Sequence, residues 1–219
     1  MRLALHAELT KLRTVAAPLW LLVGSIAATV ASSAAAVSVI SADDAADLTL
    51  IGVDLGQALV VIVAVLIISG EYSSGMMRTS LAAVPRRTTL FLSKMVVLTG
   101  IVAVAGTVAV LGAVLAGRLI QPAADGTTPR AMAGAVLYLV LIGLLSLGIA
   151  TAVRDSAASL GVVLGLLYVV PIVSQTISDP DWRRLLEKLA PMTGGLGVTA
   201  AWAAAALLIG GLLLHARDS

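Results

Sequence analysis

The stretch IGVDLGQALVVIVAVLIIS, residues 51–69, decides the class of fold. Its length matches the ~20 residues that a helix needs to cross the ~30 Å hydrocarbon core of a bilayer. Asp54 is its only charged side chain. Lipid offers no hydrogen-bonding partner to backbone groups, and the stretch lacks the alternation of a β-barrel strand. It therefore predicts a transmembrane helix.

Five further apolar stretches of similar length are bounded by charges, prolines or polar clusters. The connections between them are short, and none holds a soluble domain. We therefore predict an all-α polytopic membrane protein with a single transmembrane domain over residues 1–219. The six helices are expected at about residues 16–40, 51–69, 90–116, 131–153, 157–177 and 196–215.

The composition supports this class and excludes several functions. Apolar residues make up 59% of the 219 residues and charged residues 12%, about half of the ~25% found in soluble domains. The chain has no cysteine and only two histidines, His6 and His215. Thiolate chemistry is therefore excluded, and most metal or acid–base catalysis lacks its residues. We expect no enzymatic activity, no resident cofactor or metal, and no nucleic-acid partner.

Lys and Arg are unevenly divided between the two sides of the predicted bundle. The side that holds both termini carries nine of the 14 basic residues and four of the 12 acidic residues. Loops rich in Lys and Arg stay in the cytoplasm, so we expect both termini there. The N-terminus also fits a secretory signal peptide, because an apolar run leads to Ala-Ser-Ser-Ala-Ala-Ala at 31–36, although the run is long for a signal.

Two segments outside the spans have amphipathic patterns. Residues 1–14 place Leu5, Leu9 and Leu12 on one face, which predicts a helix along the cytoplasmic membrane surface. It would serve as an anchor or as a platform for a partner. Between spans five and six, apolar side chains recur at i, i+3, i+4 and i+7 and predict a short outer interfacial helix, which would brace the bundle or shape a substrate exit. They are Trp182, Leu185, Leu186 and Leu189.

Strongly polar side chains inside the spans are few. Asp54 and Gln57 lie near the outer end of span two, and Gln175 lies at a similar depth in span five. Such side chains face protein or a water-filled path rather than lipid. They therefore either join helices by hydrogen bonds or line a translocation path.

Small residues are spaced for close helix packing in two of the spans. Gly52-x-x-x-Gly56 and Gly161-x-x-x-Gly165 both allow helix backbones to approach closely. Each pair is either an ordinary packing position or a contact with a second copy of the chain.

Several motifs of membrane proteins are missing. The sequence has no Gly-x-x-x-x-Gly-Lys-Ser/Thr, so the chain does not bind ATP through a P-loop. It has no arginine ladder, no filter motif and no carboxylate in the middle of a span. The loop at 70–89 is instead long and basic, and it is expected on the cytoplasmic side.

Two polar stretches carry a resemblance to a known family. The sequence ELTKLRT at 8–14 precedes a span that contains Trp20, and EYSSGMMRT at 71–79 is followed by PRR at 85–87 and by Lys94. In these stretches the chain resembles actinobacterial ABC-2-type permeases, the membrane subunits of ABC transporters. Their loop after span two commonly shows an acidic–aromatic pair, a glycine, a basic residue, Pro-Arg and a lysine. The layout of six spans and the outer helix also match, although this chain is short for the family.

The resemblance implies a subunit of a larger machine. A separate P-loop ATPase, which holds ATP and Mg²⁺, would dock on the cytoplasmic side, and a second permease copy or a paralogue would pair in the lipid. Export across the inner (plasma) membrane of a bacterium is implied, with an amphipathic small molecule, peptide or lipid as cargo. The residues implied to couple the spans to the ATPase are Glu8, Lys11, Arg13, Glu71, Tyr72, Gly75, Arg78, Pro85 and Arg86.

Two alternatives stay open at this level. A carrier or exporter driven by an ion gradient would need no ATPase. A membrane enzyme or structural anchor is the third possibility, although the spans offer few groups for catalysis.

Overall fold

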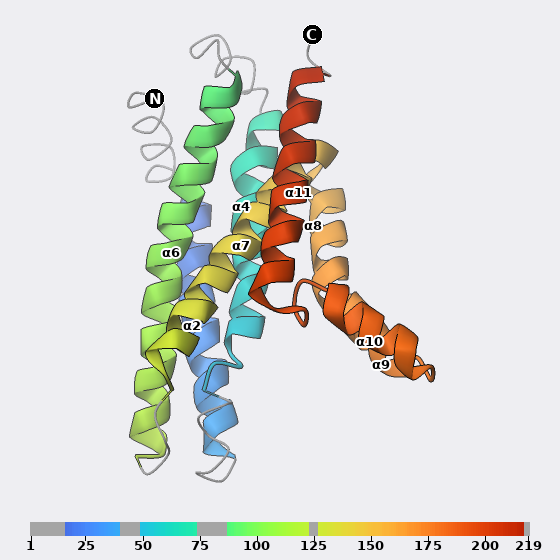
Figure 1. Ribbon diagram of the computed structural model, residues 1–219. Coiled ribbons are helices and arrows are strands. Elements are labelled where there is room, and N and C mark those ends of the chain that lie inside the picture. Colours follow the sequence, from blue (N-terminus) through green and yellow to red (C-terminus); the bar gives the residue numbers. More distant parts are fainter. Residues whose placement is uncertain (1–15, 40–48, 74–86, 123–126, 217–219) are drawn as a thin grey trace.

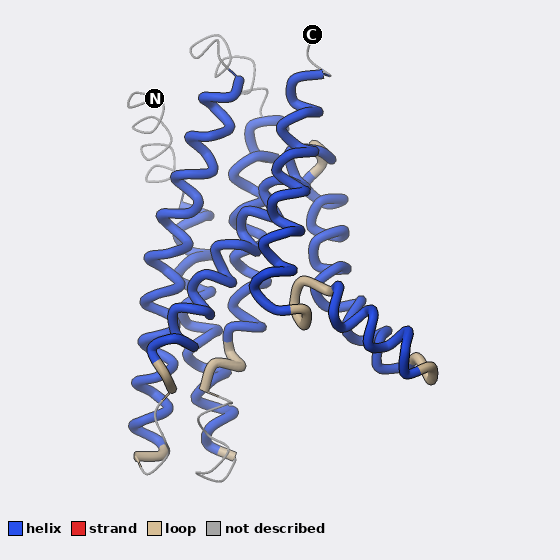
Figure 2. Tube along the Cα trace, in the orientation of Figure 1, coloured by secondary structure: helices blue, strands red, loops and turns tan. Residues whose placement is uncertain are grey.

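The computed structural model describes residues 16–39, 49–73, 87–122 and 127–216, and the regular structure in these ranges is helical (Figures 1 and 2). Six segments are long and apolar enough to cross a membrane, so the predicted all-α fold with six spans is confirmed. Five are single helices: α2 (Ala16–Ser38), α4 (Val53–Ser73), α6 (Arg87–Ile120), α7 (Pro129–Val153) and α11 (Gly195–Ala216). The other span joins α8 (Ser156–Leu164), η1 (Gly165–Val169) and α9 (Val170–Thr176), and α10 (Pro180–Leu189) follows it.

Several helix ends differ from the prediction by two to four residues, among them both ends of α4 and of α6 and the start of α7. Helix α6 continues past Ala116 to Ile120, because Gly117 and Arg118 do not stop it. Its 34 residues correspond to ~51 Å, more than a bilayer core requires. Helix α7 begins at Pro129 rather than at residue 131, because Thr128 accepts a hydrogen bond from the Ala131 N–H (3.3 Å) and Pro129 suits the first helical turn.

The fifth span contains a wide turn. Residues Gly165–Val169 form the π-helical turn η1, and Pro171 follows in α9. In a regular α-helix the proline ring would clash with the carbonyl of Leu167 and would leave that carbonyl without its donor. A π-helical turn relieves this conflict. The span that the sequence predicted as one helix therefore has three parts.

The turn between α7 and α8 is tight. Arg154 ends α7 with a left-handed backbone (φ 65°), the one positive φ of a non-glycine residue in the described ranges. Asp155 then begins α8, because its carboxylate accepts a hydrogen bond from the Ala158 N–H at 2.7 Å. These two neighbouring residues reverse the chain without a longer loop.

Helices α4 and α7 form the centre of the bundle. In the most apolar 18-residue stretch of each of these spans 56% of the residues are buried, against 17% in the corresponding stretches of the fifth and sixth spans. Helix α7 packs against α4, α6, α8 and α11, and α2 covers α4 and α6. The core side chains of α4 and α7 include Val60, Val61, Val65, Leu139, Ile142, Leu145 and Leu147.

Successive spans run in alternating directions (Figure 1). The end of α4, the start of α6 and the end of α11 therefore lie at one end of the bundle. Helices α9 and α10 project from the bundle as an arm toward the opposite end. The cytoplasmic side stays a prediction from the charges, and the predicted helix at 1–14 lies outside the described residues.

Candidate functional site

Gln57 of α4 is a polar side chain with no exposed surface. Its Oε1 accepts a hydrogen bond from the Tyr138 hydroxyl of α7 at 2.6 Å. Its Nε2 donates to the Sδ atom of Met192, in the loop between α10 and α11, at 3.8 Å. Both ends of the amide are therefore used, as a polar group away from water requires.

A second tyrosine binds the start of α4. The Tyr168 hydroxyl of η1 donates a hydrogen bond to the backbone carbonyl of Asp54. The half-buried Asp54 carboxylate lies in the first turn of α4, where the helix dipole favours a negative charge. We call Asp54, Gln57, Tyr138, Tyr168 and Met192 the outer polar cluster, because the charge distribution predicts that this end of the bundle faces outward.

The fold explains how the outer polar cluster forms. Asp54 and Gln57 are three residues apart, so they lie on neighbouring positions of one helix surface. Helix α4 packs against both α7 and α8, which bring Tyr138 and, through η1, Tyr168 to that surface. Met192 arrives from the loop that follows α10. Four segments that are distant in sequence therefore meet at one polar site inside an apolar bundle.

The sequence did not single out Tyr138, Tyr168 or Met192. A tyrosine in an otherwise apolar span needs a partner for its hydroxyl, and this requirement was the available signal for the two tyrosines. Gln175 is exposed on α9, which packs against η1 and α10. The structure therefore does not bring Gln175 into the cluster with Gln57, although their depths along the two spans are similar.

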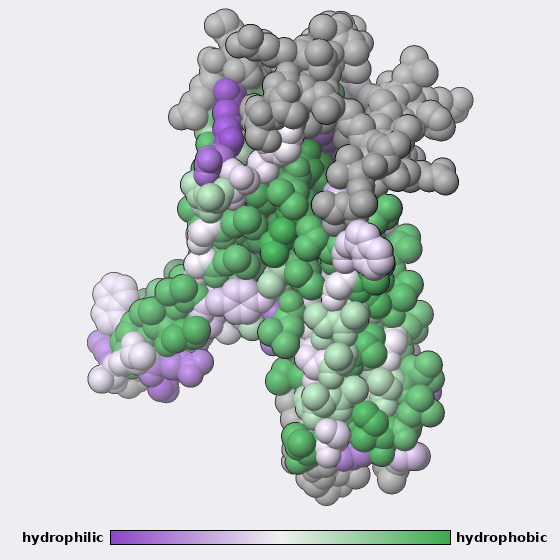
Figure 3. All heavy atoms as spheres, turned by 180° about the vertical axis from the view of Figure 1, so that it is seen from behind, coloured by the Kyte–Doolittle hydropathy of each residue, from purple (hydrophilic) through white to green (hydrophobic). Residues whose placement is uncertain are grey.

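Helix α10 has the surface of an interfacial helix. Trp182, Leu185 and Leu189 are 63%, 50% and 56% exposed, and Leu186 is partly buried. Asp179 caps the helix by accepting a hydrogen bond from the Asp181 N–H at 2.9 Å. In Figure 3 the arm formed by α9 and α10 is hydrophobic along one face and hydrophilic along the other. The predicted role of this helix at the outer membrane surface stays a prediction.

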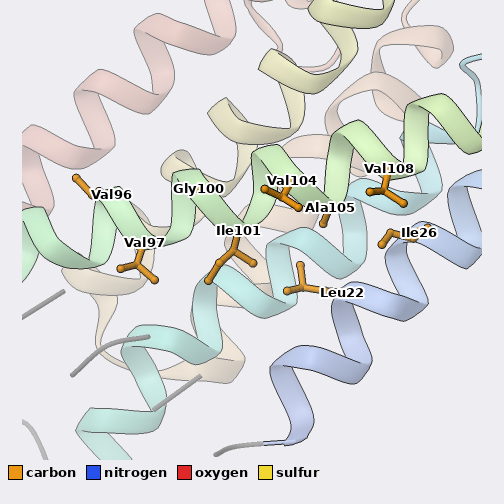
Figure 4. A pocket seen from close by; sticks show the side chains of 9 residues that line it. All are labelled: Leu22, Ile26, Val96, Val97, Gly100, Ile101, Val104, Ala105 and Val108. Atoms are coloured by element: carbon orange, nitrogen blue, oxygen red, sulfur yellow. The ribbon is translucent and has the colours of Figure 1, made fainter. Parts of the chain in front are cut away.

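An apolar groove lies between α2 and α6 (Figure 4). Its volume is about 630 Å³, and its lining consists of aliphatic side chains and one glycine. Such a lining offers dispersion contacts alone, so the groove suits a hydrocarbon chain. The lining residues are Leu22, Ile26, Val96, Val97, Gly100, Ile101, Val104, Ala105 and Val108.

A comparison with known protein families shows to which family this chain belongs. Residues 4–172 match the model of a family described as ABC-2 family transporter protein. The chain belongs to the ABC-2 transporter family. None of the curated proteins matches its sequence. The resemblance read from residues 8–14 and 71–87 is thus confirmed, and the chain is a membrane transport component of a kind that works with an ATP-binding subunit.

The segment expected to couple an ABC-2 protein to its ATPase begins on α4. Glu71 and Tyr72 lie in the last turn of this helix. Lys94, which follows in the same motif, is buried in α6. The remaining coupling residues lie outside the described part of the chain, so their role stays a prediction. They are Glu8, Lys11, Arg13, Gly75, Arg78, Pro85 and Arg86.

Metal chemistry finds no support in the described ranges. No group of three or more His, Asp or Glu side chains there could hold a metal ion. The outer polar cluster combines an uncharged hydrogen-bond network around Gln57 with the neighbouring residue Asp54.

Proposed function

We propose that this chain is the permease subunit of an ABC exporter in a bacterial inner membrane. A separate P-loop ATPase supplies the energy, and two permease copies or two paralogues form the membrane part. The match to the ABC-2 transporter family over residues 4–172 carries this proposal, because it covers both segments assigned to the ATPase contact. ATP and Mg²⁺ bind to the ATPase subunit.

Helix α4 supports the mechanism. It runs without interruption from Val53 to Ser73, and it contains both the polar residues Asp54 and Gln57 and the coupling residues Glu71 and Tyr72. By the rise of 1.5 Å per residue, Gln57 and Glu71 are ~21 Å apart along the helix axis. ATP-driven closure of the ATPases would push the segment at 71–86, and α4 would carry this movement to the outer polar cluster. Nucleotide binding would then shift the equilibrium between the two access states of the path.

The expected cargo is amphipathic. The groove between α2 and α6 is apolar, and the outer polar cluster contains hydroxyl, amide and carboxylate groups that an opening of the path would free for a cargo. A molecule with a hydrocarbon part and a polar part would match both surfaces. A small amphipathic compound, a peptide and a lipid all meet this description.

The first test is a search for the ATPase. The chain is affinity-purified in a mild detergent, and co-purifying proteins are identified and counted by mass spectrometry. We expect a P-loop ATPase at one copy per permease chain. Transport that stops with a protonophore but continues after ATP depletion would overturn the proposal in favour of a carrier driven by an ion gradient.

The second test addresses the coupling segment. Glu71→Ala should leave the complex assembled but lower the transport achieved per ATP hydrolysed. Glu187→Ala is the matched control, because Glu187 is partly exposed on α10, far in sequence from the coupling segment, and forms an ion pair with Arg183 at 3.8 Å. Normal assembly and transport after the whole segment at 71–87 has been scrambled would contradict the assigned role.

A further inference from the structure

The loop at residues 190–194, between α10 and α11, is held at its start by hydrogen bonds from α11. The Trp202 indole N–H of α11 donates a hydrogen bond to the Leu189 carbonyl at 2.8 Å. The Thr199 hydroxyl, also from α11, donates to the Pro191 carbonyl at 2.7 Å. Ala190 and Pro191 are buried. We call residues 190–194 the outer loop, and these bonds make it a defined structure that moves with α11.

One side chain of the outer loop reaches the central helix. The Met192 sulfur accepts the hydrogen bond from Gln57 Nε2, although Gln57 itself has no exposed surface. The outer loop therefore lies over the outer end of α4 and covers its most buried polar group. An approach to the Gln57 amide from the side of Met192 has to displace this loop.

The two hydrogen bonds of the Gln57 amide differ in strength. The bond from the Tyr138 hydroxyl is short, at 2.6 Å, and joins two oxygen atoms. The bond to the Met192 sulfur is long, at 3.8 Å, and a thioether is a weak acceptor. When α4 moves, the contact with Met192 should therefore break first, while α4 and α7 stay joined through Tyr138.

We propose that the outer loop is the outer gate of the transport path, and that the Met192–Gln57 contact, with Gln57 oriented by Tyr138, is its latch. The proposal rests on the proposed function, because it takes the surface of α4 as a wall of the path. The movement that opens the latch would enter α4 at Glu71 and Tyr72. Tyr138 is a positioning residue, since it acts through Gln57.

The absence of cysteine from the sequence makes a clean accessibility test possible. Val60→Cys places one thiol a single helical turn from Gln57 toward the middle of the bundle. Val60 is 2% exposed and faces Gly143 of α7. The full chain with its ATPase is studied in right-side-out vesicles loaded with ATP and Mg²⁺ or with ADP. The external probe is the membrane-impermeant thiol reagent 2-(trimethylammonium)ethyl methanethiosulfonate.

With the latch intact, Cys-specific labelling at position 60 should be slow with ADP and faster with ATP. Adding Met192→Ala should raise the rate with ADP roughly fivefold, the factor expected for the loss of one uncharged hydrogen bond. Tyr138→Phe keeps the shape of the ring and should give a smaller increase. Met132→Ala is the matched control, because Met132 packs against the core near the start of α7. The Val60→Cys chain that also carries Met132→Ala should be labelled at the same rate as the parent, which is the Val60→Cys chain alone.

The outcomes separate the latch from the proposed function. Faster labelling with Met192→Ala, together with a response of the labelling rate to ATP, supports both the latch and the proposed function. A response to ATP with no effect of Met192→Ala overturns the latch and leaves the ATP-driven transporter standing. An effect of Met192→Ala without any response to ATP supports the latch and overturns the proposed energy source. Fast labelling of the parent with ADP overturns the gate.

Discussion

The two Gly-x-x-x-Gly pairs of this chain lie in opposite surroundings. At Gly52 an added Cβ atom would lie 2.1 Å from the Thr29 carbonyl oxygen, and at Gly56 it would lie 2.0 Å from the Thr29 hydroxyl oxygen. At Gly161 and Gly165 an added Cβ would meet no atom within 4 Å. The first pair therefore brings α2 and α4 into close contact, whereas the second lies on an open face of α8 and η1. Small residues permit a close approach of two helices, but they do not create one.

Substitution of the tightly packed pair should have the largest effect on stability. Gly52→Val would push a side chain into the backbone of α2 and should cost about 3 kcal/mol of stability, the upper part of the range for overpacked cores. Gly161→Val is the matched control and should stay within ~0.7 kcal/mol of the parent. Thermal unfolding of both variants is measured in the same detergent, with tryptophan fluorescence as the signal, and the midpoints are compared. Equal losses for the two variants would refute the contrast.

Helices α7 and α11 also approach each other closely where they cross, although neither helix contains a Gly-x-x-x-Gly pair. At Gly148 an added Cβ would lie 2.5 Å from the backbone carbon of Ala206. Gly148→Val should destabilise the protein by about 2 kcal/mol. Hydrogen–deuterium exchange should rise mainly in α11, since its other contacts are few. Unchanged exchange in α11 would show that this helix is held by other parts of the bundle.

The polar groups around the tight pair should contribute less than its shape. The Ser33 hydroxyl accepts a hydrogen bond from the Gly52 N–H at 3.2 Å, and both residues are buried. Ser33→Ala should cost about 1 kcal/mol, because the N–H loses its partner. Ser38→Ala should cost nearly nothing, because Ser38 is exposed and donates to the Ala35 carbonyl within its own helix. Chemical or thermal unfolding of the two variants side by side tests the difference.

The smallest effect on stability is expected at Gly161 and Gly165, the glycine pair on the open face, and there the change should be a gain in stability. Gly161→Ala should raise stability slightly, by up to ~1 kcal/mol, since alanine is the better helix former and the space is free. The thermal midpoint and the mass of the detergent-solubilised particle should be measured together. A lower midpoint, or a smaller particle, would show that a second chain packs against this face.

Much of the fold could be predicted because lipid imposes strict requirements on a spanning segment. The run at 51–69 must be helical for its backbone to be satisfied, and the same holds for the other five stretches. Boundaries were less predictable where local chemistry decides them. Thr128 and Pro129 start α7 before its apolar run, and α6 continues past Ala116 through Arg118 to Ile120.

The candidate site was predictable in part. The rarity of polar groups in the spans singled out Asp54 and Gln57, and both lie in the outer polar cluster. Gln175 has the same signal but is exposed on α9. Depth along a helix can be counted from the sequence, whereas the direction of a side chain depends on how the helix is rotated. The π-helical turn η1, which precedes α9, changes that rotation in the fifth span.

The sequence by itself determined that this protein crosses the membrane six times, because each apolar run must satisfy its own backbone hydrogen bonds. It also pointed to the family through the polar residues at 8–14 and 71–87, whose chemical type and local spacing can be read without knowledge of the fold. Only the tertiary structure decided which glycine pair is packed, which polar side chains meet, and that Met192 lies on Gln57. These contacts join residues far apart in the chain, and helices of similar apolar composition can pack in many rotations, so only their actual packing selects the partners.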